Sequence, residues 1–501
     1  MMTESQRVLV TGATGYVGGR LAPRLAEVGH HVRVLVRGGP ERLVGRPWAA
    51  DVEVVSGDVL HPETLGPALD GIDVAFYMIH SMGGGHGRFA ERDLAAARGF
   101  AQAAAQAGVK RIIYLGGLGD AGANLSEHLR SRQATGDALR EAGVPVTEFR
   151  AGMVVGSGSL SFEMMRALTE RLPVMLCPTW VFTRTQPIAI RDVLAYLVGA
   201  LDQPESAGAI IEIGGADVLT YAEMMTTYAR LRGLRRWLLP VPVLSPELSA
   251  HWVNLITPIP GDIARPLIEG LRNELVVRND LARRLFPTIE PIDFATAVTL
   301  ALGRIARGQV ETIWSDALAS SRGDVPPVYL TEEQGMLLER RTCEVAASPA
   351  TVYRVFTGIG GKRGWPAFDW LWQVRGWMDR LVGGVGMRRG RRHPDELRVG
   401  DALDFWRVES VIPDRVIVLR AEMKLPGQGW LRFEANPGAT PGTTQLVQTA
   451  FFAPKGLFGL LYWYGVYPLH GVVFSNMVAT LARQAETAEQ AALNLKPAQQ
   501  P

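Results

Sequence analysis

The sequence contains very little cysteine. Its 501 residues include only Cys177 and Cys343, which lie far apart and form no CxxC pair. This spacing argues against a disulfide framework and against a thiolate metal site. The HExxH, EF-hand and Cys/His patterns that bind metals are also missing, so we predict no metal ligands. Such a chain suits a reducing cytoplasm.

The sequence also lacks an excess of one charge. Its 52 basic residues nearly balance 50 acidic ones, and the net charge is +2. This balance gives no reason to expect a nucleic acid partner, so small molecules are the better expectation. Met1 to Gln6 is polar and runs straight into Val8, which leaves no room for the apolar part of a signal peptide. We therefore expect a cytoplasmic protein.

One long stretch, Gly456 to Ala482, has no Asp, Glu, Lys or Arg. Its length approaches that of a bilayer span. Pro468, His470 and Ser475 interrupt it, however, which favours a buried hairpin and a core helix. Peripheral membrane contact is the alternative, so membrane association stays open.

The first part of the chain alternates short apolar runs with helical patterns. This alternation predicts an α/β fold with a doubly wound parallel sheet. We expect a Rossmann core at about residues 5–155 and a substrate lobe at about 156–317, which together form a domain over 1–317. The six expected core strands are Arg7–Val10, His31–Arg37, Val52–Val55, Val74–His80, Arg111–Leu115 and Val146–Phe149.

The segment 318–335 has no periodicity and contains Pro326-Pro327, so we interpret it as a linker. A second domain should cover 336–493, with a tail at 494–501. A helix from Pro349, several strand-like runs between residues 401 and 452, and a last helix from Val473 to Leu493 predict an α+β domain with an antiparallel sheet. Such an arrangement can enclose an apolar cavity.

A glycine-rich turn follows the first strand. Gly12, Gly15 and Gly18 have GxxGxxG spacing between an apolar strand and a helix. Glycines permit the tight turn, the approach of a pyrophosphate and close packing of the helix, while the helix N-terminus attracts phosphate. The sequence therefore predicts a dinucleotide site, which also involves Thr14, Tyr16 and Val17.

The residue that ends the second strand distinguishes the two nicotinamide cofactors. An acid there would bind the ribose hydroxyl of NAD, but this chain has Arg37, with Arg42 nearby. A guanidinium suits a 2′-phosphate, so NADP(H) is favoured over NAD(H). A solvated strand end is the alternative for Arg37. Asp58 and Val59 follow the third strand, where Asp58 can meet the adenine or cap a helix.

These segments resemble the extended and atypical short-chain dehydrogenase/reductase family over about residues 5–310, through Thr11–Gly18, Gly57-Asp58 and Tyr77–Met82. The closest likeness is to the subgroup that resembles the nucleotide-binding accessory subunit of respiratory complex I, in which Thr185–Val193 is also familiar. The resemblance implies that His80 lies at the cofactor.

The chain departs from the chemistry of that family, which relies on a Ser and a Tyr-x-x-x-Lys pair. Gly116-Gly117 stands where the Ser is expected, while His128 and Arg132 take the Tyr and Lys positions. His128 can donate a proton, and its alternatives are a cofactor contact or a surface position. Arg132 can bind the cofactor ribose but keeps its proton too firmly to relay it.

The second half resembles an uncharacterised domain that often follows such reductases, through Phe405–Glu409 and Ala421–Gly427. Its expected layout is similar to the START-like helix-grip fold, which implies a lipid or another hydrophobic ligand. Trp365–Trp377 is rich in aromatic residues that suit a pocket, a membrane interface or an ordinary core. Arg388–Arg392 suits anionic headgroups or a solvated loop.

Together these observations favour an NADP(H)-dependent oxidoreductase with a non-standard active site that acts on a hydrophobic quinone or lipid-like substrate. The alternative is a non-catalytic NADP(H)-binding module for redox sensing or assembly, whose second domain binds a lipid or a partner. The missing Ser and Tyr leave open whether the protein is an enzyme.

Overall fold

A computed structural model describes residues 5–39, 43, 46–79, 89–120, 125–241, 261–306, 328–333, 336–381 and 397–494. The chain divides into two compact units, Met1–Gly323 and Asp324–Pro501, which are described separately below.

The first unit is built on a seven-stranded sheet in the order β11-β6-β5-β4-β1-β2-β3. Every pair of neighbours in it is parallel, which confirms the predicted doubly wound fold. The strands are β1 (Arg7–Thr11), β2 (His31–Val36), β3 (Glu53–Ser56), β4 (Val74–Tyr77), β5 (Arg111–Gly117), β6 (Val146–Ala151) and β11 (Ile210–Ile213).

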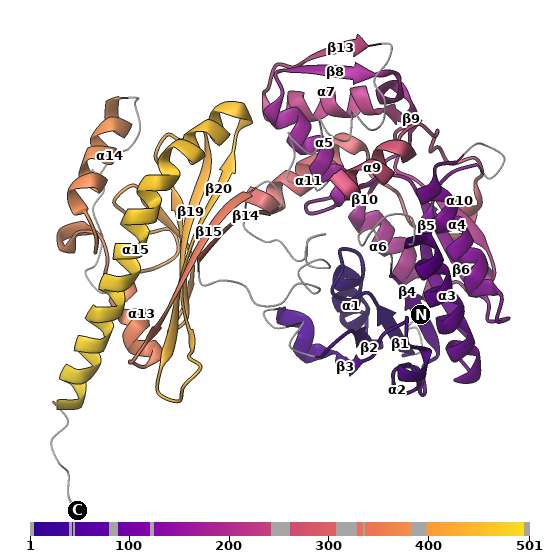
Figure 1. Cartoon of the computed structure of the whole chain (residues 1–501), viewed down its shortest axis with the longest axis horizontal. Helices are drawn as coiled ribbons and strands as arrows, with labels where there is room; N and C mark the ends of the chain where they lie inside the picture. The colour runs from indigo at the N-terminus through magenta and orange to yellow at the C-terminus, as the bar shows by residue number, and fades with distance from the viewer. Residues whose placement is uncertain are drawn as a thin grey trace, which may run out of the picture. The chain divides into compact units, whose positions relative to one another are not determined.

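Both faces of this sheet are covered by helices, as Figure 1 shows. Val8 and Val10 of β1 point to the face packed by α1 (Gly18–Glu27) and α6 (Ile190–Gly199), and Leu9 points to the other. The second face is covered by α2 (Gly66–Leu69), α3 (Phe89–Gln106) and α4 (Glu127–Arg140). Because β1 is buried on both faces, it is apolar throughout rather than alternating.

The predicted substrate lobe forms a smaller layer with its own core of Phe162, Met165, Met224 and Tyr228. Its helices are α5 (Leu160–Arg171), α7 (Tyr221–Arg232), α9 (Gly261–Gly270) and α11 (Phe294–Ala306), whereas α10 (Leu281–Leu285) packs on the core of the main sheet. Three two-stranded pairs complete it: β7 (Val154–Val155) with β10 (Ile188–Ala189), β9 (Arg184–Thr185) with β12 (Leu219–Thr220), and β8 (Val174–Pro178) with β13 (Trp237–Val241).

The second unit is an antiparallel sheet of seven strands in the order β14-β15-β20-β19-β18-β17-β16. This confirms the predicted α+β architecture. The strands are β14 (Val328–Glu333), β15 (Met336–Val345), β16 (Ala402–Leu403), β17 (Trp406–Ile412), β18 (Val416–Ala421), β19 (Gly427–Pro437) and β20 (Thr444–Pro454). Helices α13 (Pro349–Thr357) and α15 (Gly456–Asn494) pack on the sheet, and α14 (Asp369–Leu381) adds a further helix (Figure 1).

Two details differ from the sequence-based expectations. Strand β14 lies inside the segment expected as a linker, where it pairs with β15. The charge-free stretch from Gly456 is not a hairpin and a helix but the first part of one continuous helix, α15, which runs through Pro468. Proline removes a helical hydrogen bond. The buried residues on both sides of it, Trp463 and Phe474, pack into the same core and keep the helix in place.

Helix α15 is the one helix among the described residues that is long and apolar enough to cross a membrane by length and composition. One of its faces is nevertheless part of the core of the second unit, where Trp463, Met477 and Leu481 are buried. The opposite face is exposed. This pattern is that of a helix that lies on a sheet.

Phe356 is the best place to test this core. Its ring is fully buried on α13 and stacks on Phe433 at a centroid distance of 5.7 Å. We expect Phe356→Ala to lower the free energy of unfolding by about 3–5 kcal/mol. Urea unfolding followed by tryptophan fluorescence measures this, because seven of the 12 tryptophans follow residue 364.

Phe458→Ala is the matched control, since this phenylalanine of the same unit is 81% exposed. It should change the unfolding free energy by less than about 0.5 kcal/mol. Similar losses in both variants would show that α13 does not pack as described.

Candidate cofactor and substrate site

The turn after β1 is fixed to the neighbouring strand β4 by one buried hydroxyl. The Thr11 Oγ1 donates to the Phe76 carbonyl at 3.1 Å and accepts from the Met78 N–H at 3.0 Å. The strand order reverses between β1 and β4, and ligands of open parallel sheets bind in the crevice at such a switch point.

The three glycines of the turn differ in what a side chain at each position would meet. Gly12 has φ +66°, and a Cβ there would lie 2.6 Å from the Met78 carbonyl oxygen. A Cβ on Gly18 would collide with the Gly12 carbonyl, so this glycine lets α1 start close to the turn. A Cβ on Gly15 would touch only the Gly12 oxygen, at 3.2 Å, so this position faces open space. The geometry thus leaves a cradle for a phosphate.

Helix α1 begins at this cradle with no side-chain cap and no acid in its first turn, which suits an anion. Thr14, Gly15, Tyr16 and Val17, which are predicted to bind the cofactor, line the cavity beside it together with Gly12. The predicted Gly18 is buried behind them. The Arg20 guanidinium lies 4.3 Å from the Tyr16 ring centroid and holds that ring in place.

Arg37 lies directly after β2, is exposed, and lines the same cavity. Among the described residues it makes no ion pair, so its charge is available to an anion. A second cation, Arg46, donates to the Thr14 carbonyl at 3.1 Å and lies over Trp48. Sequence reasoning missed Arg46, because only the folded chain brings it back to the turn.

Asp58 and Val59 also line the cavity, after β3. One Asp58 oxygen accepts the Leu60 N–H at 3.0 Å, so this carboxylate stabilises its own turn, in line with the capping alternative. The predicted cofactor residue His80 lies outside the described residues, and so does Arg42, which follows Arg37 in the sequence.

The cavity has a volume of about 580 Å³ and continues beyond the turn into the lobe. Its far wall is apolar, with residues from α5, α7 and α9 and the loops around them. The side chains that form it are Leu160, Met164, Met165, Leu168, Trp180, Met225, Leu267, Ile268, Leu271 and Leu275.

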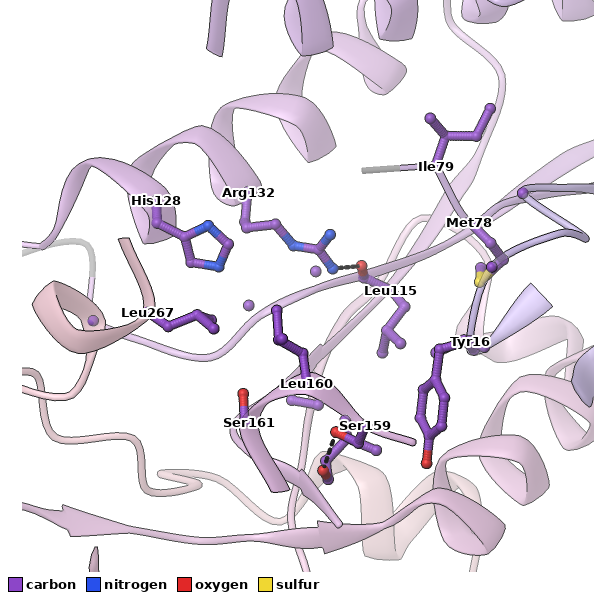
Figure 2. A pocket seen from close by; sticks show the side chains of 18 of the residues that line it. Tyr16, Met78, Ile79, Leu115, His128, Arg132, Ser159, Leu160, Ser161 and Leu267 are labelled. Carbon is purple, nitrogen blue, oxygen red and sulfur yellow. Dashed lines mark hydrogen bonds between the residues drawn. The ribbon is translucent and has the colours of Figure 1, made fainter. Parts of the chain in front are cut away.

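His128 and Arg132 lie one turn apart on α4, and both line the cavity. Figure 2 shows the half-buried imidazole of His128 with Leu267, Leu160 and Ser161 across the gap. The Arg132 guanidinium donates to the Leu115 carbonyl and lies 5.5 Å from the Tyr114 ring centroid. Arg132 is therefore held against the end of β5 at the wall of the cavity.

No hydroxyl can replace the missing Ser at Gly116 or Gly117 without displacing neighbours. A Cβ at Gly116 would lie 2.9 Å from a Glu148 oxygen, and one at Gly117 would lie 3.2 Å from Leu129. Two of the tyrosines that line the cavity, Tyr77 and Tyr221, do not supply an acid either. Burial raises the pKa of each phenol, whereas the family chemistry needs a lowered one.

The polar groups opposite His128 were not predicted from the sequence. Ser161 is the second residue of α5, and Ser159 before it donates to the Val154 carbonyl at 2.7 Å. Both line the cavity. The only local signal is the Gly156-Ser157-Gly158-Ser159 turn that precedes a helix, which by itself indicates no contact with α4.

Fold and turn together define an NAD(P)-binding Rossmann protein. Residues 4–240 match the NmrA-like family, and residues 334–477 match a family described as a protein of unknown function (DUF2867). The chain is 31% identical over 292 residues to a (4-alkanoyl-5-oxo-2,5-dihydrofuran-3-yl)methyl phosphate reductase of Streptomyces griseus subsp. griseus, covering 57% of this chain and 92% of that protein.

It is 30% identical over 249 residues to a ceramide reductase of Caulobacter vibrioides, covering 48% of this chain and 76% of that protein. It is also 25% identical over 276 residues to mitochondrial NADH dehydrogenase [ubiquinone] 1 alpha subcomplex subunit 9 of Arabidopsis thaliana. This match covers 52% of this chain and 67% of that protein. The chain belongs to the NmrA-like family of atypical short-chain dehydrogenases/reductases. This confirms the predicted resemblance for the first unit.

The turn can be tested with a pair of glycines. Gly12→Ala should raise the dissociation constant of NADPH by about 10- to 100-fold, because the new methyl group displaces the turn from the phosphate and hydrogen bonds to a charged group are lost. Gly29→Ala is the matched control, since Gly29 also has a positive φ, +93°, but open space around it.

Gly29→Ala should cost about 1 kcal/mol of stability and leave NADPH binding unchanged. The measurement is a fluorescence titration of each variant with NADPH. Unaltered affinity in Gly12→Ala would place the dinucleotide elsewhere.

Proposed function

We propose that this protein is an NADP(H)-dependent reductase with a non-standard active site, whose substrate is a hydrophobic quinone or lipid-like carbonyl compound. One observation carries the proposal: a single cavity joins the dinucleotide turn to an apolar wall, with a histidine between them.

The residues present fit the cofactor. The cradle at Gly12 and Gly18 is one that a Cβ would fill, the start of α1 is uncapped, and Arg37 stands where a 2′-phosphate would lie. A guanidinium binds such a phosphate with paired hydrogen bonds, and the residue directly after β2 is this arginine rather than an acid. These features favour NADP(H) over NAD(H).

When bound, the reduced dinucleotide supplies a hydride. If the acceptor is a carbonyl carbon, its oxygen must take up one proton. We assign His128 as the donor, because its imidazole faces the cavity and an unperturbed histidine, with a pKa of about 6.5, carries a transferable proton near neutrality. Arg132, one turn further along α4, is assigned to binding the ribose of the cofactor.

The apolar wall supports the choice of substrate. Met164, Met165 and Met225 are unbranched and adaptable, so they can fit a flexible chain as well as a ring. The names of the two bacterial relatives give a ceramide and an alkanoyl-substituted oxo-dihydrofuran methyl phosphate as their substrates. Both are molecules with long or acyl apolar parts, and we extend this class to the present chain.

For the second unit we propose a START-like helix-grip domain that binds a hydrophobic ligand. Its sheet packs against the long C-terminal helix, as in that arrangement. Between sheet and helix lies a buried polar cluster: Glu339 accepts from Arg341, and Arg341 donates to the Ser475 hydroxyl at 3.1 Å. Nearby Gln448 is 1% exposed, and neither of its amide atoms has a partner among the described residues. A polar headgroup would satisfy it.

A second function is favoured by a specific observation. Gly116 and Gly117 leave no room for the family's Ser, and the Arg132 guanidinium is held by the Leu115 carbonyl. A module that binds NADP(H) for redox sensing or assembly needs neither group. Turnover distinguishes the two proposals, since only a reductase oxidises NADPH when supplied with quinones or enones.

Cofactor choice is tested at Arg37. NADPH should bind more tightly than NADH, and Arg37→Ala should weaken NADPH by about 10- to 100-fold, because one charged contact is worth about 1.5–3 kcal/mol. NADH affinity should not change and so serves as the internal control. Arg37→Asp should reverse the preference. Equal affinity of the unaltered protein for both cofactors, measured by titration, would exclude the assignment.

The acid is tested at His128. His128→Phe should lower turnover of an accepted quinone or enone by about 10²- to 10⁴-fold and leave NADPH binding nearly intact. The exposed His61, whose imidazole lies 3.2 Å from a Glu63 oxygen, provides the matched control His61→Phe, which should retain full activity. Weaker NADPH binding with unchanged turnover at saturating cofactor would instead make His128 a cofactor contact.

A further inference from the structure

Helix α14 carries a row of large apolar side chains that the rest of the protein leaves exposed. They are three or four residues apart, so they lie on one side of the helix. Their exposed fractions range from 45% to 68%. The row consists of Trp370, Val374, Trp377, Met378 and Leu381.

The opposite side of α14 is anchored, which fixes the direction of this row. The ring of Trp372 lies 4.9 Å from Trp365 and 6.3 Å from Phe474 of α15 between centroids. Its indole N–H donates to the Ala367 carbonyl at 3.2 Å. Because Trp372 belongs to the core of the second unit, the helix cannot turn its apolar row inward without losing these contacts.

The first half of α15 adds a second apolar surface in the same unit. Six large side chains are 41% to 81% exposed along it, and no charged residue interrupts them between Lys455 and Arg483. They are Leu457, Phe458, Leu461, Tyr464, Leu469 and Val472. The buried face of α15 packs on the sheet, so this exposed surface is the part of the helix that can contact a bilayer.

The charges around α14 are positive. Its acids are occupied inside the unit: Asp369 accepts the Trp365 N–H at 2.9 Å, and the buried Asp379 accepts the Lys424 N–H at 2.7 Å. From Asp369 to Glu396 the sequence has six arginines and four acids. Four of those arginines follow α14 in a segment outside the described residues. This charge complements an anionic surface.

We propose that the second unit docks on the surface of an anionic phospholipid bilayer through the exposed faces of α14 and α15. Tryptophan and tyrosine favour the interface of a bilayer, and cations beside them favour anionic headgroups. This proposal is independent of the reductase function, because it concerns a surface of the second unit alone.

The test uses the full chain and sedimentation with vesicles. Vesicles of phosphatidylcholine with phosphatidylglycerol should bind the protein and shift its tryptophan emission to shorter wavelength, while pure phosphatidylcholine should bind it much less. The double variant Trp370→Glu/Trp377→Glu should lower the partition coefficient by about 100-fold, because two exposed rings that would enter the bilayer interface are replaced by charges.

Trp237→Glu is the matched control, since Trp237 of β13 is 63% exposed but lies in the first unit. It should bind vesicles like the unaltered protein. Retained NADPH binding and an unchanged urea transition show that the double variant is folded.

Three results would overturn the proposal. The first is failure of the unaltered protein to bind anionic vesicles, and the second is equal binding by the double variant. The third is a dimer in solution that the double variant converts to a monomer while vesicle binding is absent, which would assign the surface to a second copy of the chain.

Discussion

The nucleotide site depends on one close contact between main chains, where the turn after β1 passes the end of β4. Gly12 adopts φ +66°, and its α-carbon faces the Met78 carbonyl so closely that a methyl group would not fit. The Thr11 hydroxyl joins the same two strands by accepting from one residue of β4's end and donating to another. Because β1 and β4 meet where the strand order reverses, this contact positions both the phosphate cradle and the crevice beside it.

The rest of the site is arranged around that fixed point, and the two sides of the cavity differ in chemistry. The nucleotide side keeps the features that any dinucleotide requires, namely close glycines and an uncapped helix. The substrate side has lost a hydroxyl and a phenol and has gained an imidazole. His128 and Arg132 share one face of α4 and both line the cavity, but the Arg132 guanidinium is bonded to the Leu115 carbonyl, and an arginine keeps its proton too firmly to donate it. Any acid–base role on α4 therefore falls to His128.

Much of the fold could be predicted because its signals are local. The GxxGxxG spacing, the apolar strands and Arg37 after β2 are each set by neighbours in sequence, and the structure shows them where expected. The apolar wall could not be predicted, since it gathers side chains from α5, α7 and α9, far apart in the chain. The prediction that the chain breaks at Pro468 was wrong for a physical reason. Proline lowers local helix stability, but the burial of Trp463 and Phe474 on either side of it outweighs one lost hydrogen bond.

The two proposals, a lipid-like substrate for the first unit and a bilayer-docking surface on the second, are connected by how such a substrate reaches the protein. A lipid-like compound partitions into bilayers, so its concentration in water is low and encounter in solution is slow. A chain held at a bilayer surface by α14 and α15 samples the phase that contains the compound, whichever way its two units are oriented. Weak docking is sufficient, because the protein needs to remain only long enough to acquire a molecule. Interfacial tryptophans and scattered arginines give attraction of this moderate kind, whereas a spanning helix would fix the protein permanently.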